Sequence, residues 1–258
     1  MKVWHMNGAG NDFLVVDARG LTLDLSALAK DLCARIGADG FMALDNSETA
    51  DFRLHFYNSD GSRGEMCGNG SRCICRFAYE TGIAGEKMTI QTDAGLVYGQ
   101  RLSQEQYQVQ LNNPGILDLV RKETVAYVEL GCPGVPHAVL EVSGLTWEDR
   151  DALREQARSL RFDPAFPKGA NVNFYTWLGE GHIRILSYER GVEDYTLACG
   201  TGTASTACVL WAGGQLPGGK LIAENPGGTL IVTVEGECRT VSKLLLQGPT
   251  EITKIFEI

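Results

Sequence analysis

The chain has 258 residues, of which 44% are hydrophobic and 21% charged, and its formal net charge is −9. This length accommodates one large domain or two of ordinary size. The acidic balance argues against a nucleic-acid-binding surface, and no apolar run reaches the roughly 18–20 residues of a membrane span. Residues 1–6 enter a strand pattern at once, unlike a signal peptide. We therefore expect a soluble, cytoplasmic protein that binds neither nucleic acid nor membrane.

The eight cysteines are scattered along the chain. Disulfide frameworks belong mostly to small secreted domains, so this distribution argues against one. Cys33, Cys208 and Cys238 stand in apolar-periodic runs, where a thiol acts as a small hydrophobic group. We expect these three to be structural.

Strands and helices alternate in the first half of the chain. Strand patterns cover residues 3–6, 13–17, 41–44 and 51–57, and helical spacing covers 26–35 and 71–80. Ser26 is a plausible N-cap of the first helix and Gly37 a plausible stop. Residues 87–111 read as two or three strands with breaks at 93–95 and Gly99. The polar turn at 112–115 is the best domain boundary.

The second half repeats this plan. Strands are expected at residues 126–130, 138–142, 172–177, 183–188, 220–224, 229–235 and 240–246, and helices at 146–160 and 203–211. Thr146 and Asp149 resemble a capping box at the start of the first of these helices. A repeat of this length predicts two similar domains, residues 1–115 and 116–249, and residues 250–258 could pack back on the first.

Each half carries one Cys-Gly-x-Gly motif, at Cys67 and at Cys199, followed by a predicted helix. Each thiol would then lie at a helix N-terminus, where unpaired N–H groups and the macrodipole favour a thiolate and lower the thiol pKa. The same N–H groups can bind a carboxylate. Two such helix ends would suit inversion of an amino-acid α-carbon, one thiolate removing the proton and the opposite thiol returning one.

Three other interpretations of these cysteines are open. Each could be a buried turn residue, although the duplication argues against this. Cys67, Cys73 and Cys75 could bind a metal, but 73 and 75 fall on different helix faces and no histidine completes a site, so we expect none. Cys67 and Cys199 could form a redox pair, but the chain lacks the Cys-x-x-Cys motif of oxidoreductases.

The motifs together resemble the diaminopimelate epimerase family, which needs no pyridoxal cofactor. The matching stretches are residues 7–13 (NGAGNDF), 57–62 (YNSDGS), 66–72 (MCGNGSR), 136–137 (PH), 171–174 (NVNF), 188–191 (YERG), 197–202 (LACGTG) and 226–228 (PGG). The resemblance implies an α+β fold of two pseudo-symmetric domains, each a mixed sheet curled around a central helix. It also implies an active site in the cleft between them, no cofactor, and an isomerase of lysine and cell-wall biosynthesis.

The resemblance also implies roles for individual residues. Cys67 and Cys199 look like the acid and base, and His137 and Glu189 like groups that assist the thiols and hold the α-amine. The α-carboxylate would bind at Gly68, Asn69, Gly200 and Thr201. Other substrate contacts would come from Asn11, Asn58, Asn171 and Arg190, with Arg190 pairing the distal carboxylate.

Three departures from the family pattern concern the far end of the substrate pocket. Gly40 stands where Gln is usual and leaves space, Val135 replaces Asn and adds an apolar wall, and the loop between Arg190 and Cys199 carries one extra residue. Our first hypothesis is epimerisation of LL-diaminopimelate to the meso form. The second is racemisation of another amino acid such as histidine, and the third is a non-catalytic amino-acid-binding protein. A homodimer is the default expectation for assembly.

Overall fold

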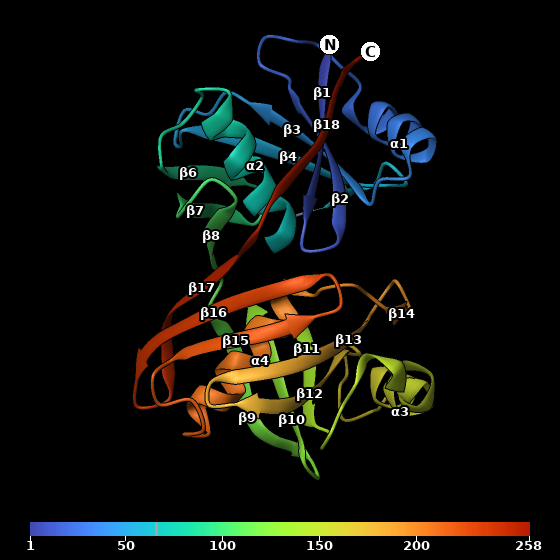
Figure 1. Cartoon of the computed structure of the whole chain (residues 1–258), viewed down its shortest axis with the longest axis vertical. Coiled ribbons are helices and arrows are strands. Elements are labelled where there is room, and N and C mark those ends of the chain that lie inside the picture. Colours follow the sequence, from blue (N-terminus) through green and yellow to red (C-terminus); the bar gives the residue numbers. More distant parts are fainter. Residues whose placement is uncertain (65–66) are drawn as a thin grey trace. The chain divides into compact units, whose positions relative to one another are not determined.

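The computed structural model describes residues 1–64 and 67–258 and divides the chain into two compact units, drawn in Figure 1. The first unit comprises Met1–Gln110 and Gln247–Ile258, and the second comprises Leu111–Leu246. The boundaries expected from the sequence fall after residues 115 and 249. Met66, in the first cysteine motif, lies outside the described residues.

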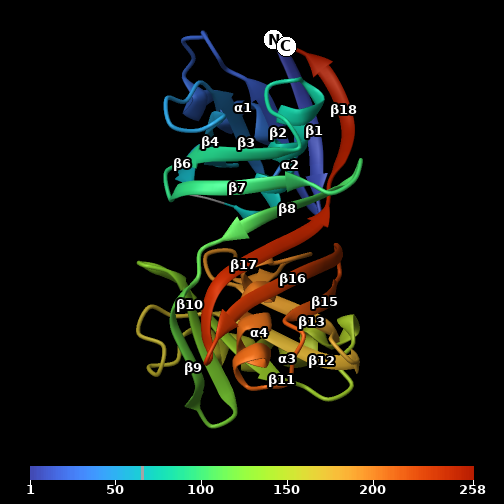
Figure 2. The same ribbon diagram turned by 90° about the vertical axis from the view of Figure 1, so that its left-hand side faces the viewer.

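The first unit contains a mixed sheet. Its strands are β1 (Lys2–Gly8), β2 (Asn11–Asp17), β3 (Gly40–Asp45), β4 (Phe52–Asn58), β5 (Arg63–Gly64), β6 (Lys87–Thr92), β7 (Gly95–Arg101), β8 (Gln106–Leu111) and β18 (Glu251–Glu257). Antiparallel pairs are β18–β1, β1–β2, β3–β4, β4–β5, β6–β7 and β7–β8, and parallel pairs are β2–β3 and β4–β6. The C-terminal strand β18 therefore belongs to this unit and runs along β1, as Figure 2 shows.

Helix α2 (Gly68–Glu80) is the central helix of this sheet. It packs against β1, β2, β3 and β7, and its residues from Gly68 to Ala78 are buried. Successive residues of a strand point to opposite faces. Trp4 of β1 accordingly meets Phe77 of α2 edge-to-face at 5.2 Å between ring centroids. Its neighbour Val3 instead joins the core beneath α1 (Leu25–Ile36).

The cap expected for α1 at Ser26 is wrong. Asp24 is the N-cap, and its carboxylate accepts the Ala27 N–H at 3.0 Å. The hydroxyl of Ser26 instead donates to the Gly61 carbonyl at 2.7 Å. The predicted stop is confirmed, because Gly37 ends the helix in the left-handed conformation at φ 84°.

The second unit repeats the topology of the first. Its strands are β9 (Pro114–Lys122), β10 (Val125–Gly131), β11 (Gly134–Glu141), β12 (Asn171–Gly179), β13 (His182–Glu189), β14 (Asp194–Tyr195), β15 (Lys220–Asn225), β16 (Gly228–Glu237) and β17 (Thr240–Pro249), the last of which continues past the boundary. The succession antiparallel, parallel, antiparallel, parallel, antiparallel along β1, β2, β3, β4, β6 and β7 recurs along β10, β11, β12, β13, β15 and β16.

Helix α4 (Gly200–Ala212) is the counterpart of α2. It packs against β9–β12, β15 and β16, and small residues such as Ala204 and Ala207 let the strands approach it. Helix α3 (Arg150–Arg161), the counterpart of α1, covers the other face through Ala157 and Leu160. A one-turn 3₁₀ helix (Trp147–Asp149) precedes it, where the Thr146 N–H donates to Asp149 at 2.7 Å. The predicted fold class, a mixed sheet around a central helix in each half, is confirmed.

Several local expectations were wrong. β9 was not predicted, because its residues are mostly half-buried or exposed and show no regular alternation. Gly99 lies within β7 and does not break it. Cys33 and Cys208 are buried as expected, but Cys238 is exposed at the turn between β16 and β17.

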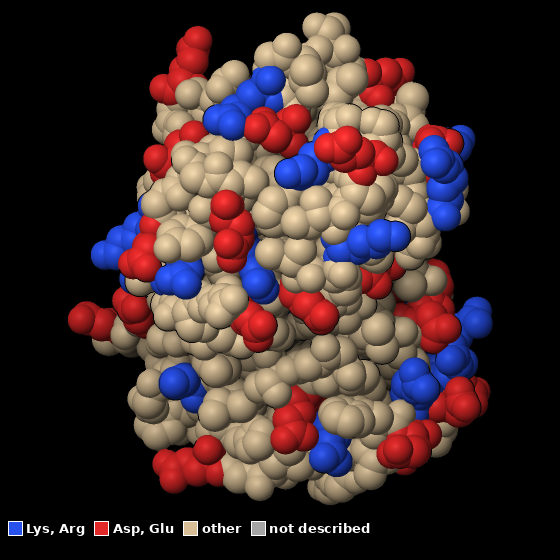
Figure 3. Space-filling model, turned by 45° about the horizontal axis from the view of Figure 1, so that its top comes forward, with Lys and Arg blue, Asp and Glu red and all other residues tan. Residues whose placement is uncertain are grey.

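Within the described residues, no helix is long and apolar enough to cross a membrane. Acidic and basic side chains are interspersed on the face that Figure 3 shows. This mixture agrees with the acidic but unclustered charge of the sequence.

Candidate active site

Cys67 is the N-cap of α2. Its backbone is extended (φ −128°, ψ 122°), and its thiol sulfur accepts the Gly70 N–H at 3.5 Å. The side chain is half-buried. An α-helix leaves its first N–H groups without intrahelical acceptors. The N–H groups of Gly68 and Asn69 therefore lie at the end of the helix where an anion is stabilised.

A chain of polar side chains supports this helix end. The buried Arg72 donates to Asn69 Oδ1 at 3.0 Å, and Asn69 Nδ2 donates to Asn11 Oδ1 at 2.7 Å. Asn11 in turn donates to Asp39 at 3.3 Å, and Asp39 also accepts the Asp12 N–H at 2.9 Å. The predicted contacts Asn11 and Asn69 are thus joined directly, each orienting the amide of the other.

Asn11, Gly40 and Asn58 lie at one end of three adjacent strands. Asn11 begins β2, Gly40 begins the parallel β3, and Asn58 ends the antiparallel β4 opposite Gly40. The Asn58 amide donates to Ser62 Oγ at 2.9 Å.

Gly40 does not leave space, contrary to the sequence interpretation. A Cβ at this position would lie 2.9 Å from the Phe56 ring and 3.1 Å from the Tyr57 carbonyl oxygen. The ring already occupies the volume that a side chain would need. Val135 is likewise no buried wall within its unit, since 40% of it is exposed.

Cys199 caps α4 as Cys67 caps α2. Its backbone is also extended (φ −114°, ψ 106°), and its sulfur accepts the Gly202 N–H at 3.3 Å. The Thr201 hydroxyl lies 3.5 Å from the same sulfur. Gly200 and Thr201 are the first two residues of this helix, so their N–H groups correspond to those of Gly68 and Asn69.

Glu189 is the acidic partner of Cys199. Its carboxylate accepts the Thr196 hydroxyl at 2.5 Å, and its charge acts on the thiol of Cys199. Burial raises the pKa of Glu189 above its ordinary value, although the hydrogen bond from Thr196 acts to lower it.

The thiol pKa expected for Cys199 from its helix-end position is wrong in direction. Burial raises the pKa of Cys199 well above its ordinary value, and the charge of Glu189 raises it further. Hydrogen bonds from Thr201 and Gly202 lower it by less. Desolvation of a thiolate outweighs the helix end here, so Cys199 rests as a neutral thiol.

Asn171 and Arg190 are joined by a hydrogen bond at the end of β13, where Arg190 directly follows Glu189. Asn171 Oδ1 accepts the Arg190 N–H at 2.8 Å, and its amide donates to the Pro136 carbonyl at 3.2 Å, which ties β11, β12 and the end of β13 together. The Arg190 guanidinium donates to the Lys168 carbonyl at 3.0 Å. The Lys168 side chain is anchored by an ion pair of 2.7 Å with the buried Glu129.

His137 is fully buried on β11, opposite Asn171 in the parallel pair with β12. Its Nδ1 lies 3.2 Å from Asn173 Nδ2. Burial and the nearby Arg190 charge lower the pKa of His137 to about 3. The imidazole is therefore neutral at ordinary pH.

The two units thus carry equivalent half-sites. Asn11, Asn58, Cys67, Gly68 and Asn69 gather in the first unit. The second unit gathers His137, Asn171, Glu189, Arg190, Cys199, Gly200 and Thr201. Each half-site combines a thiol at a helix N-terminus with polar groups at strand ends. The helix N–H groups can bind a carboxylate, and the thiol can move a proton at the adjacent carbon. In the described part of the chain, no group of three or more His, Cys, Asp or Glu residues is placed to hold a metal ion.

In the second unit, five supporting residues escaped the sequence interpretation. They are Glu129, Lys168, Asn173, Ser187 and Thr196. Asn173 lies within the quoted NVNF motif, and Thr196 lies just before the second cysteine motif, so position alone could have drawn attention to them. Glu129, Lys168 and Ser187 carry no such signal, because their partners are distant in sequence.

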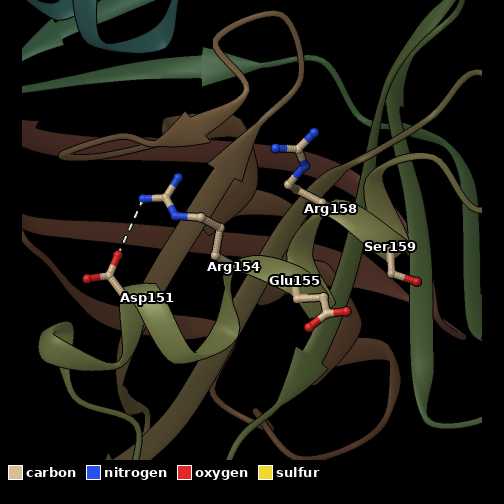
Figure 4. A pocket seen from close by; sticks show the side chains of 5 residues that line it. All are labelled: Asp151, Arg154, Glu155, Arg158 and Ser159. Atoms are coloured by element: carbon tan, nitrogen blue, oxygen red, sulfur yellow. Dashed lines mark ion pairs between the residues drawn. The ribbon is translucent and has the colours of Figure 1, made fainter.

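A hollow of about 560 Å³ lies elsewhere, on α3. It is lined by Asp151, Arg154, Glu155, Arg158 and Ser159, shown in Figure 4. Arg154 pairs with Asp151 and with Asp194, so its charge is already balanced. No predicted site residue lines this hollow, and we assign it no role in the chemistry.

The chain is similar to known proteins over nearly its whole length. The sequence profile described as "Diaminopimelate epimerase" matches residues 3–115 and 132–251. A diaminopimelate epimerase of Aquifex aeolicus is 36% identical over 283 residues, covering 100% of this chain and 96% of that protein. One from Campylobacter jejuni is 39% identical over 205 residues, covering 78% of each.

Solved structures at lower identity share the fold. A PhzF-family phenazine biosynthesis protein of Bacillus anthracis superposes with a TM-score of 0.72 at 17% identity, covering 100% of this chain and 98% of that one. A hydroxyproline epimerase of Agrobacterium vitis superposes with a TM-score of 0.70 at 18% identity, covering 99% and 91%. From the sequence matches, which span nearly the whole chain, this protein belongs to the diaminopimelate epimerase family of isomerases.

Proposed function

We propose that this protein inverts one α-carbon of diaminopimelate, converting the LL form to the meso form without pyridoxal phosphate. The observation that carries the proposal is the duplicated helix end, in which Cys67 and Cys199 cap topologically equivalent helices. The relatives reported above are named for diaminopimelate, and they give no support to histidine as the substrate. The reaction belongs to lysine biosynthesis.

This mechanism requires both half-sites to act on one substrate molecule. The N–H groups of Gly68, Asn69, Gly200 and Thr201 bind the α-carboxylate, into which negative charge moves as the α-proton leaves. One cysteine, as thiolate, takes the α-proton and forms an S–H bond. The other, as thiol, gives its proton to the opposite face of the carbon. The roles reverse for the other isomer.

The state of Cys199 supports a starting assignment. It rests as a thiol and is therefore the proton donor, which leaves Cys67 as the base in the resting enzyme. When Cys199 must act as base, the proposed acceptor of its proton is Glu189, whose charge acts on this thiol. Hydrogen-bond donors, such as the helix N–H groups, lower the activation barrier when they bind the transition state more strongly than the ground state.

Arg190 is the proposed partner of the distal carboxylate. Its guanidinium carries five donors and is held on one side by the Lys168 carbonyl at 3.0 Å. Assembly as a homodimer and a cytoplasmic location remain predictions from the sequence.

Turnover in D₂O tests the proposal. With LL-diaminopimelate and no added pyridoxal phosphate, deuterium should enter one α-carbon as the meso isomer appears. A panel that includes L-histidine sets the specificity. If no amino acid exchanges its α-hydrogen, the result supports the hypothesis of a non-catalytic amino-acid-binding protein. If histidine turns over while diaminopimelate does not react, diaminopimelate is not the substrate.

A further inference from the structure

His137 has one ring nitrogen with a partner and one without. Its Nδ1 lies 3.2 Å from Asn173 Nδ2. Its Nε2 is buried and has no hydrogen-bond partner among the described residues. Buried polar groups are ordinarily hydrogen-bonded, so the absence of a protein partner for His137 Nε2 needs an explanation.

The orientation of the Asn173 amide follows from its other contacts. One side of the amide lies 3.0 Å from the Ala138 carbonyl oxygen, which can only accept. That side must therefore be the NH₂ group. The opposite side accepts the Ser187 hydroxyl at 2.9 Å, as an amide oxygen does.

The protonation of His137 follows in turn. Because Asn173 presents NH₂ to Nδ1, that ring nitrogen must accept, and the neutral ring then carries its proton on Nε2. An imidazolium would set an Nδ1–H against the amide N–H. We propose that Asn173, braced by Ser187, is a positioning residue that holds His137 as a neutral Nε2–H hydrogen-bond donor. This inference rests on the proposed function for the acceptor, an anionic atom of the reacting substrate or thiol.

The surroundings of His137 favour the same state. The ring is fully buried, and the Arg190 charge also disfavours a second positive charge, so the pKa of His137 falls to about 3. Such a ring does not hold the cationic α-amine, which needs an acceptor. Glu189 remains the acceptor for that group, and His137 supplies an N–H where negative charge develops.

The backbone of α4 keeps Asn173 in place. A Cβ on Gly202 would lie 2.1 Å from Asn173 Oδ1 and 3.1 Å from Ser187 Oγ. The residue whose N–H bonds to Cys199 therefore also packs against the amide that orients His137. The first turn of α4 thus contacts both the Cys199 thiol and the Asn173 amide that orients His137.

Nitrogen-15 NMR of histidine-labelled enzyme tests the assignment directly. The chain has four histidines, and a His137→Gln spectrum identifies the signal that belongs to His137. Long-range proton–nitrogen correlations distinguish a protonated from a bare ring nitrogen. At pH 7 we expect a protonated Nε2 and a bare Nδ1. A protonated Nδ1, or a doubly protonated ring, overturns the inference.

Asn173→Asp replaces the donor by an acceptor of nearly the same shape. We expect the His137 proton to move to Nδ1, and kcat to fall by at least about tenfold while KM changes by less than about threefold, as loss of one correctly protonated group predicts. Asn113→Asp is the matched control, because the Asn113 amide donates to the Ser242 carbonyl and not to a histidine. It should change neither spectrum nor rate.

Asn173→Ala covers the case in which the aspartate variant does not fold. Without a donor at Nδ1, His137 should show both tautomers, and retention of pure Nε2–H contradicts the positioning role. The spectra need no turnover. If His137 carries its proton on Nε2 but the enzyme exchanges no deuterium, the proposed function is contradicted and this inference is not. If the enzyme is active but His137 carries its proton on Nδ1, this inference is contradicted and the proposed function is not.

Discussion

The carboxylate of Glu189, ten residues earlier in the chain, acts on the buried thiol of Cys199 and raises the pKa of that thiol. The pair connects the end of β13 to the beginning of α4. A thiol at a helix N-terminus is ordinarily acidified. Here burial and the neighbouring carboxylate reverse that effect, so Cys199 rests protonated.

Each of the two N-cap cysteines should be essential. Cys67→Ala and Cys199→Ala should each lower the racemisation rate by at least about 10²-fold, because an acid or base contributes on the order of 10²–10⁴. Cys238→Ser is the control, since that exposed thiol lies at the turn between β16 and β17. The measurement is the circular-dichroism time course with LL-diaminopimelate. Full activity in either alanine variant contradicts a two-base mechanism.

Glu189→Gln should make the Cys199 thiol more acidic. The carboxylate charge raises the pKa of Cys199, so its removal lets the thiolate form at lower pH. Alkylation of Cys199 by iodoacetamide, followed by mass spectrometry across pH, should rise at lower pH than in the wild type. At the same time kcat should fall by about 10²-fold, because the proton acceptor for the thiol is lost.

Glu193→Gln is the matched control for that substitution. Glu193 lies in the same loop, but its carboxylate pairs with Arg161. In this variant, the pH dependence of Cys199 alkylation should match that of the wild type. An unchanged profile for Glu189→Gln would show that the carboxylate does not act on the thiol.

Burial of His137 should make stability fall in mild acid. The pKa of His137 is about 3 in the folded protein and about 6.5 when unfolded, so between these values the unfolded state binds more protons. Stability from this group is complete above pH 6.5 and is lost as pH falls toward 3, at up to about 1.4 kcal/mol per pH unit. Urea unfolding at pH 7 and pH 5 measures it.

His137→Gln should flatten that pH dependence. His182→Gln, at a half-exposed histidine that pairs with Glu224, should leave the steep acid slope in place. Equal slopes in the wild type and His137→Gln would contradict burial of a neutral ring at this position.

Gly202→Ala should be destabilising and should couple to Asn173. The added Cβ would lie 2.1 Å from Asn173 Oδ1, and overpacking of this kind costs about 1–3 kcal/mol. Asn173→Ala should recover part of that loss in the double variant, as a double-mutant cycle by urea unfolding would show. Gly218→Ala is the control, because its Cβ would meet nothing within 4 Å. Strict additivity would argue against the contact.

Arg190→Lys should weaken binding of diaminopimelate more than it slows the chemistry. Loss of a hydrogen bond to a charged group costs about 1.5–3 kcal/mol, which corresponds to a KM raised by roughly 10–100-fold. Arg158→Lys, on α3, should leave KM unchanged. A lower kcat at constant KM would place Arg190 in the chemistry and not at the distal carboxylate.

Local patterns in the sequence were sufficient for much of the molecule. The spacing of apolar residues located the four α-helices of the described residues and most of their strands, and the repeated Cys-Gly-x-Gly motif located the N-terminal ends of α2 and α4. Asp24 was missed as a cap because Ser26 also fits the pattern, and only the contact with Gly61 shows that its hydroxyl is used elsewhere. β9 was missed because a half-exposed strand has no strict alternation.

The sequence by itself determined the duplicated architecture, the two thiols and the family, because these depend on short motifs and their order along the chain. The tertiary structure decided the protonation and surroundings of those groups. Cys199 rests as a thiol because it is buried beside Glu189, and His137 is neutral because it is buried near Arg190. The Phe56 ring occupies the space that a side chain at Gly40 would need. Desolvation and packing depend on residues far apart in the chain, and a local pattern does not contain them.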